Sequence, residues 1–82
     1  MEYCAYILYS NKINKYYVGS SSDINSRVKY HNSEKNKIWT KKGQPWELKK
    51  TIGCENRSDA LKLENKIKRM KSRKYIENLI NE

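Results

Sequence analysis

The spacing of hydrophobic residues along the chain predicts three short strands. Residues 3–9, YCAYILY, form an apolar run rich in aromatic and β-favouring residues, and residues 16–19, YYVG, form a shorter one. Residues 10–15 are polar and favour a turn, so these two strands are expected to pair as a β-hairpin. Residues 46–54, WELKKTIGC, alternate as in a half-buried third strand. The expected inward residues of that strand are Trp46, Leu48, Ile52 and Cys54, with Lys50 breaking the alternation.

Apolar residues three and four positions apart predict a helix after the hairpin. Residues 20–32, SSSDINSRVKYHN, begin with Ser and Asp residues that can cap a helix, and Asp23 suits its positive end. One face of this helix carries Ile24, Arg27, Val28 and His31. Residues 32–45 are polar and basic and end in Gly and Pro, so they predict a loop. Trp39 in this loop either contacts a ligand or closes the edge of the core.

Two further helices are predicted near the C-terminus. Ser58 is the expected N-cap of the first helix, and Glu64 falls within its apolar face. That apolar face consists of Ala60, Leu63, Ile67 and Met70. Residues 72–80 form the second helix, with Tyr75, Ile76, Leu79 and Ile80 facing inward. The order β-β-α-β-α-α predicts an α+β fold in which helices flank a small, mainly antiparallel three-stranded sheet.

Length and charge narrow the class of protein. Eighty-two residues are expected to form a single domain over residues 1–82 with a small core. The sequence has 18 basic and 9 acidic residues, a net charge of +9 spread over both halves, which favours a nucleic-acid partner over an unremarkable lysine-rich surface. No run is long enough to cross a membrane, and the N-terminus lacks a signal-peptide pattern. The expected location is the cytoplasm, or the nucleus in a eukaryote.

The two cysteines give no sign of a metal site or a disulfide. Cys4 and Cys54 lie fifty residues apart, and neither belongs to a CxxC pair. With a single histidine in the chain, no recognisable zinc-ligand spacing exists. The two residues are therefore interpreted as small buried hydrophobic side chains.

Three polar residues are expected to face inward and need an explanation. Burying an unpaired charge is costly, so either Arg27 and Glu64 form a salt bridge with His31 hydrogen-bonded beside them, or the three residues mark a ligand-binding cleft. Hairpin pairing brings Tyr6 close to Tyr17. Gly19 at the end of the second strand leaves room for a ligand or a backbone to approach the sheet.

These residues resemble the signature of the GIY-YIG nuclease superfamily. CAY at residues 4–6 and YVG at residues 17–19 resemble its two paired motifs, although Cys4 and Ala5 replace the first Gly and Ile. DINSRVKYH supplies the arginine and histidine of the following helix, and Glu64 in ALKLENKIK stands where the family has its metal ligand. KGQPWEL followed by RSDALKLENKIK is similar to small standalone members. These are related to the nuclease domain of bacterial excision-repair incision proteins and to Slx-type structure-specific nucleases.

The resemblance implies a set of catalytic roles. Glu64 would bind a single divalent cation, Mg²⁺ or Mn²⁺, and Arg27 would hold a non-bridging phosphate oxygen. A tyrosine would act as general base toward water. Tyr17 is the expected base and Tyr6 the residue that orients water or phosphate, although the sequence does not settle this division. His31 would orient a tyrosine or assist proton transfer.

The expected substrate is DNA, recognised through its backbone or its structure rather than its sequence. The residues expected to contact the substrate are Gly19 and four lysines that would bind phosphate, namely Lys12, Lys15, Lys29 and Lys41. A second basic concentration, over residues 62–74, either follows a DNA backbone or is a solvated helix face. The leading interpretation is a metal-dependent endonuclease in DNA repair, recombination or mobile-element biology. The alternatives are a non-catalytic nucleic-acid-binding module and a subunit that needs a protein partner for target specificity.

Overall fold

The predicted order of elements is confirmed. The computed structural model describes residues 3–82, so Met1 and Glu2 of the predicted domain lie outside the described residues. The chain forms, in order, β1 (Tyr3–Ser10), β2 (Lys15–Ser21), α1 (Ile24–His31), a 3-10 helix η1 (Trp39–Gly43), β3 (Trp46–Cys54), α2 (Arg57–Met70) and α3 (Arg73–Ile80). β2 extends beyond its predicted span, and the predicted loop contains η1.

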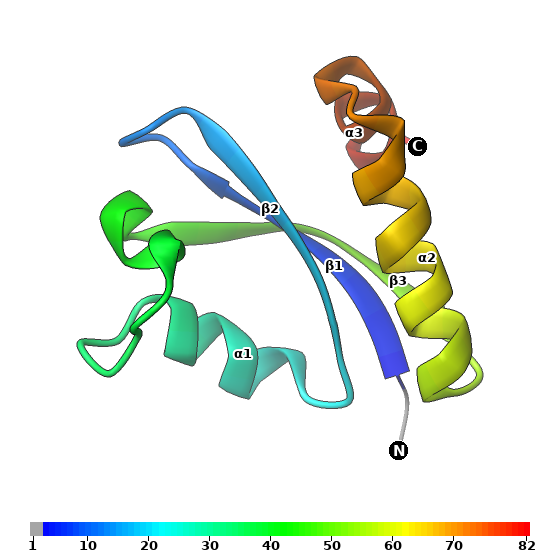
Figure 1. Cartoon of the computed structure of the whole chain (residues 1–82), viewed down its shortest axis with the longest axis horizontal. Coiled ribbons are helices and arrows are strands. Elements are labelled where there is room, and N and C mark those ends of the chain that lie inside the picture. Colours follow the sequence, from blue (N-terminus) through cyan, green and yellow to red (C-terminus); the bar gives the residue numbers. More distant parts are fainter. Residues whose placement is uncertain (1–2) are drawn as a thin grey trace.

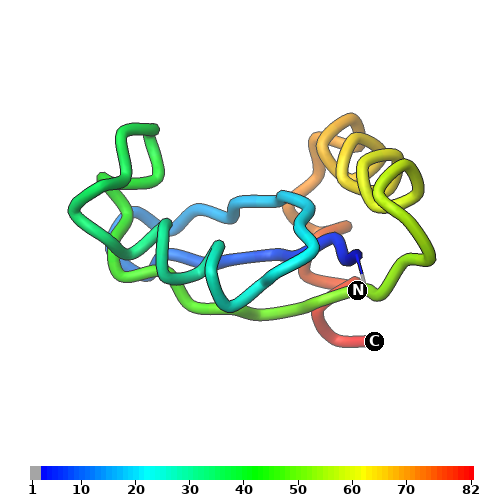
Figure 2. The backbone as a smooth tube through the Cα atoms, turned by 90° about the horizontal axis from the view of Figure 1, so that it is seen from below, coloured from blue at the N-terminus to red at the C-terminus, as the bar shows by residue number. Residues whose placement is uncertain are grey.

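The sheet has the order β2-β1-β3, with both neighbouring pairs antiparallel, so the predicted three-stranded antiparallel sheet is confirmed. β1 is central because its apolar residues are buried on both faces. In the hairpin register, Tyr6 lies opposite Gly19 and Leu8 lies opposite Tyr17. Figure 2 shows β2 as the outermost strand on one side of the sheet, with the 32–43 segment at one end of it and α2 at the other.

A β-bulge in β3 overturns the predicted alternation of that strand. Ile7 pairs with Lys50 while Leu8 pairs with Leu48, so one extra residue is inserted in β3. Trp46 and Leu48, which precede the insertion, therefore share a face with Leu8. Ile52, paired with Ala5, points to the other face. The expectation of one continuous apolar face on β3 is wrong, and the irregularity seen at Lys50 in the sequence is where the faces exchange.

The sheet carries a small hydrophobic core on each face. On one face, Tyr6, Leu8 and Trp46 pack with residues from α1. On the other, Ile7, Val18 and Ile67 pack with residues from α2 and α3, including the predicted inward set Tyr75, Ile76, Leu79 and Ile80. Figure 1 shows α1 and η1 beside one half of the sheet and α2 with α3 beside the other half. No helix in residues 3–82 is long and apolar enough to cross a membrane.

Capping side chains set where the helices begin. Asp23 caps α1 by accepting a hydrogen bond from the Ser26 amide, in agreement with the sequence. Asn56, not Ser58, caps α2, because its side chain accepts from the Asp59 amide at 2.8 Å. Asn and Ser are equally good caps, so the choice depends on where the chain leaves β3.

Two packing expectations at the ends of elements are corrected by the structure, in addition to that for Leu48, which is expected to face inward and is 39% exposed in β3. Met70 is 49% exposed because α2 ends at this residue and Lys71 turns the chain away with a left-handed φ of 47°. Cys4 and Cys54 are free and only half-buried rather than buried. Both corrections fall at the ends of elements, where the chain leaves the repeating pattern.

Side-chain hydrogen bonds hold the 32–45 segment against the sheet. The Asn32 amide nitrogen donates to the Trp46 carbonyl at 3.0 Å. The Gln44 side chain donates to the carbonyls of His31 and Ser33 at 2.9 and 2.7 Å. The Ser10 hydroxyl donates to the Gly43 carbonyl at 2.6 Å. A segment without strand or α-helix is thereby fixed relative to α1 and β3.

Candidate active site

Gly19 gives the Tyr6 side chain access to the outer edge of the sheet. Tyr6 is only 1% exposed, and its ring crosses the position where a side chain on Gly19 would stand. A Cβ atom built at Gly19 would lie 2.6 Å from both the Cζ and the hydroxyl oxygen of Tyr6, far closer than atoms pack. The glycine therefore makes room for the protein's own tyrosine, and the phenol reaches the β2 edge.

His31 is fixed beside that phenol by a buried hydrogen-bond chain. Its Nε2 lies 3.2 Å from the Tyr6 hydroxyl, and its Nδ1 lies 3.0 Å from the Thr40 hydroxyl oxygen. The Asn36 side-chain nitrogen donates to the same Thr40 oxygen at 2.7 Å. A neutral His31 that carries its proton on Nε2 satisfies every group of this chain: the Thr40 hydroxyl then donates to Nδ1, and Nε2 donates to Tyr6.

The imidazole stays neutral at physiological pH. Burial, followed by the positive charge of Arg27, lowers the pKa of His31 from 6.5 to about 4. A neutral ring is compatible with the hydrogen-bond chain, since its unprotonated Nδ1 can accept from Thr40. His31 therefore acts as a fixed hydrogen-bond donor to Tyr6.

Stability should fall as the pH drops below neutrality. Between about pH 6.5 and pH 4 the unfolded chain binds a proton at this histidine and the folded protein does not. The free energy of unfolding should decrease by about 2 kcal/mol from pH 8 to pH 5. Urea denaturation at these two values measures the change. The His31→Asn variant should lose this dependence; if it keeps the same slope, another group is responsible.

Arg27 approaches the same phenol from α1. Its guanidinium lies beside the Tyr6 hydroxyl and 5.1 Å from the centre of the Tyr30 ring. Burial raises the pKa of Tyr6, and Arg27 opposes part of that rise. Arg27 also lines a cavity of about 340 Å³ together with Arg57 and Ser20–Ser22. Two arginines and three hydroxyl groups at one cavity are suited to a phosphate group.

Glu64 reaches the β2 edge from the opposite face of the sheet. One carboxylate oxygen accepts a hydrogen bond from the Ser20 hydroxyl at 2.7 Å, and the other contacts the Lys68 ammonium at 2.5 Å. Only 13% of the Glu64 side chain is exposed. Within residues 3–82, Glu64 and Arg27 do not form an ion pair, so the salt bridge considered from the sequence is wrong. The two charges flank the strand instead of neutralising each other.

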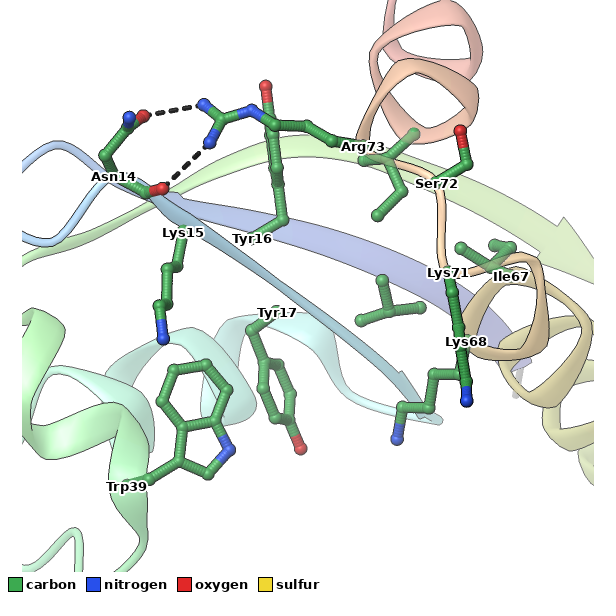
Figure 3. Close-up of a pocket in the computed structure, with 12 residues that line it drawn as sticks. Asn14, Lys15, Tyr16, Tyr17, Trp39, Ile67, Lys68, Lys71, Ser72 and Arg73 are labelled. Atoms are coloured by element: carbon green, nitrogen blue, oxygen red, sulfur yellow. Dashed lines mark hydrogen bonds between the residues drawn. The ribbon is translucent and has the colours of Figure 1, made fainter.

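Tyr17 stands on the open side of this arrangement. Its ring centre lies 6.2 Å from that of Tyr6 and 4.6 Å from that of His31, which confirms the predicted proximity of the two tyrosines. Figure 3 shows its hydroxyl pointing into a groove between Trp39 and Lys68. The phenol of Tyr17 is thus accessible where that of Tyr6 is buried.

The four lysines expected to contact phosphate are dispersed. Lys15 lines the groove beside Tyr17. Lys12 is exposed in the hairpin turn and Lys29 is exposed on α1. Lys41 donates to the Glu34 carbonyl at 3.3 Å. Of these four lysines, only Lys15 adjoins the candidate site. The other three could contact phosphates only of a substrate that extends well beyond the site.

The sequence did not indicate five residues that complete the site, namely Ser20, Tyr30, Asn36, Thr40 and Arg57. Ser20 could have been found, because the residue after Gly19 on a strand points to the face that carries Glu64. Asn36 and Thr40 lie in a segment without periodicity, where no local pattern reports a contact with His31.

The described residues offer a sparse donor set for a metal. In residues 3–82 no three His, Cys, Asp or Glu side chains come together. Glu64 would be the single charged ligand, beside the Ser20 hydroxyl. This set of hard oxygen donors fits a cation such as Mg²⁺, which keeps most of its water and takes one or two carboxylates.

An antiparallel hairpin that carries paired tyrosines, with an arginine helix on one side and a glutamate helix on the other, defines a GIY-YIG-type domain. The chain belongs to this family: residues 2–77 match the GIY-YIG catalytic domain, a family of nucleases. The solution NMR structure of a UPF0213 protein from Bacillus halodurans is similar, with a TM-score of 0.60 and 28% sequence identity over 99% of this chain and 84% of that chain. No match is found among curated proteins.

Proposed function

We propose that this protein is a metal-dependent endonuclease that hydrolyses phosphodiester bonds in DNA. The observation that carries the proposal is the convergence of Tyr6, Arg27 and Glu64 at the β2 edge, from the centre of the sheet and from both of its faces. Each supplies a group that phosphodiester hydrolysis needs: a proton acceptor, a cation for the phosphate and a metal ligand. Membership of the nuclease family supports the same reaction.

Arg27 is the proposed anchor for the scissile phosphate. Its cavity also contains Arg57 and the hydroxyls of Ser20–Ser22, so one or two phosphate groups of a DNA strand find donors there. Because Arg27 is partly buried and held against Tyr30, its guanidinium is positioned before the substrate arrives. Arg57 is a further proposed contact, with a neighbouring phosphate.

The contacts favour Tyr6 as general base and Tyr17 as the residue that orients water or phosphate, the reverse of the division expected from the sequence. His31 donates to the Tyr6 oxygen, and Arg27 lies beside it, so both stabilise the phenolate form. Burial is the main cause that raises the pKa of Tyr6, with smaller contributions from Tyr17 and Glu64, so the phenol is neutral in the free protein and must lose its proton before it can accept one from water.

Glu64 is the proposed ligand for Mg²⁺ or Mn²⁺. When bound, the cation would polarise the phosphate and leaving oxygen and would offset the negative charge of Glu64 that raises the pKa of Tyr6. Ser20 fixes one carboxylate oxygen of Glu64. The other is held by Lys68, which occupies the place of a cation and must yield to it.

The competition between Lys68 and a metal gives a testable prediction. Lys68→Met should lower the Mn²⁺ dissociation constant, measured by calorimetry without DNA, by about two- to fivefold, since an exposed ion pair contributes little more than that. The Mg²⁺ concentration for half-maximal cleavage should fall in parallel. Lys66→Met, an exposed lysine on the same helix, is the control and should change neither value. Weaker Mn²⁺ binding by Lys68→Met would contradict this role.

Cleavage assays test the proposed function directly. Purified protein is incubated with plain, nicked, flapped and branched DNA in Mg²⁺, in Mn²⁺ and in EDTA, beside the variants Arg27→Ala and Glu64→Ala. Metal-dependent cleavage by the wild type and its loss in both variants is the expected result. Absence of cleavage on every substrate, or equal cleavage by the variants, would favour a non-catalytic binding module. Activity that appears only with a protein partner would indicate a dependent subunit.

Repair, recombination and mobile-element biology are the settings proposed for this activity. The contacts proposed above are to backbone phosphates, so target choice would rest on DNA structure or on a protein partner.

A further inference from the structure

A groove of about 430 Å³ runs along the outer edge of β2, next to the candidate active site. It extends from the hairpin turn past Tyr17 to the C-terminal end of α2, and Trp39 forms one wall. Figure 3 shows Lys68 and Lys71 on the wall opposite Trp39, with their ammonium groups toward the same open side as the Tyr17 hydroxyl. The catalytic roles proposed above leave most of this groove unused.

Trp39 presents an aromatic surface that is exposed but fixed. The side chain is 47% exposed, and Trp39 is the one aromatic residue among the exposed large hydrophobic residues of the described chain. Its neighbour Thr40 is fully buried, and the Thr40 carbonyl accepts a hydrogen bond from the indole of Trp46 at 2.5 Å. The Trp39 ring also contacts Trp46 edge to face, with ring centres 5.7 Å apart. The ring is thus held in place before anything binds to it.

The groove is positively charged along its length. Lys15, Lys68 and Lys71 line it, and none of its lining residues is an acid. Arg73 also lines it but is engaged by Asn14 through hydrogen bonds of 2.9 and 2.6 Å. Glu64 does not line the groove, but its carboxylate pairs with the Lys68 ammonium at 2.5 Å. A fixed aromatic face flanked by cationic side chains is the combination that binds single-stranded nucleic acids.

We propose that this groove binds an unpaired nucleic-acid strand, with one base stacked on the exposed face of Trp39 and its phosphates along Lys15 and Lys68. The base does not enter between Tyr17 and Trp39, whose ring centres are 5.8 Å apart, and stacks instead on the part of the Trp39 ring that borders the open side of the groove. If the protein is the nuclease proposed above, the strand continues from the groove to Tyr6 and Arg27; this last step rests on that proposed function. The preferred substrate then carries an unpaired segment beside the cleaved bond.

A peptide strand is the competing occupant. In the described sheet the outer edge of β2 has no strand beside it, and such edges can accept an added strand. Charge favours the nucleic acid: three lysines line the groove, only Lys68 is paired with an acid, and such a surface suits a phosphate chain better than a peptide backbone. The experiment below includes an acidic peptide to separate the two.

Binding is measured by fluorescence anisotropy in EDTA, so that no cleavage occurs. The probes are a labelled oligothymidylate and a labelled hairpin duplex of equal charge. Trp39→Ala should weaken binding of the oligothymidylate about tenfold and that of the duplex less than twofold, since stacking requires an unpaired base. The control is Ile38→Ala, because this neighbour is also exposed, at 40%, and lies outside the groove.

Each outcome bears on the stacking proposal. Equal loss for both probes, or no loss for either, would overturn it and leave backbone contacts alone. An unlabelled acidic peptide of the same charge that competes as well as the oligothymidylate, with the same dependence on Trp39, would assign the groove to a peptide. Because the assay needs neither metal nor cleavage, its failure leaves the proposed nuclease activity standing. Conversely, if the protein binds the oligothymidylate selectively but never cuts DNA, the binding groove would be supported and the nuclease activity would not.

Discussion

Glu64→Gln should reduce the rate of DNA cleavage about a thousandfold. Glutamine has the same shape and can still accept the hydrogen bond from Ser20, but it lacks the charge that would hold a divalent cation. A bound metal contributes several kcal/mol to the stabilisation of a phosphoryl transition state, and each 1.4 kcal/mol corresponds to about tenfold in rate. Single-turnover cleavage of a saturating substrate in Mg²⁺ gives the rate for comparison with the wild type.

Two controls separate the loss of chemistry from the loss of fold. Glu47→Gln makes the same change at an exposed glutamate in β3 that also pairs with a lysine, Lys49, at 3.3 Å. It should leave cleavage within twofold of the wild type. Thermal unfolding of both variants should stay close to that of the native protein, and DNA binding in EDTA should persist. A Glu64→Gln enzyme that retains a tenth of its activity would refute the assigned role.

Gly19→Ala should damage both stability and activity although it adds a single methyl group. The new Cβ would lie 2.6 Å from the Tyr6 ring and hydroxyl. Tyr6 cannot swing aside easily, because it is 1% exposed and bound to His31. Overpacking of this kind costs about 1–3 kcal/mol, and displacement of a catalytic group by about 1 Å costs about a hundredfold in rate. Urea denaturation and single-turnover cleavage measure the two effects.

Gly53→Ala is a matched control for this substitution. Gly53 lies in β3, and a Cβ there would meet no atom within 4 Å. This variant should be as stable as the native protein or slightly more so, because alanine restricts the unfolded chain. The test of mechanism is a double-mutant cycle: in a Tyr6→Phe background, Gly19→Ala should lose part of its effect on rate. Full additivity would show that the glycine acts independently of the Tyr6 hydroxyl.

The order of elements could be predicted because, within most of them, the hydrophobic residues follow the pattern of a single type of secondary structure. β1 and β2 have the apolar content of strands around a short polar turn, and the helices repeat at three and four residues. The sequence therefore placed Tyr6, Tyr17, Arg27 and Glu64 on the correct elements. The resemblance of the same residues to the GIY-YIG signature indicated the family.

Features that depend on long-range contacts could not be predicted. The bulge in β3 shifts its register against β1, and the sequence of β3 shows only a break in alternation at Lys50, not the extra residue. The Asn36–Thr40–His31 chain connects a segment without periodicity to a helix. The strand pattern places Ser20 on the face that carries Glu64, but not the hydrogen bond between them, which joins residues 44 positions apart. Each is a side-chain contact between elements, and only the packed fold determines it.

The placement of the site across the sheet has a consequence for how activity is acquired during folding. Arg27 is held by the core on the α1 face, whereas Glu64 is held by the core on the α2 and α3 face. Neither core alone brings the two charges to the β2 edge, so a half-folded chain would lack a working site. The site that the proposed function needs should therefore exist only in the fully folded protein, in which both cores have formed.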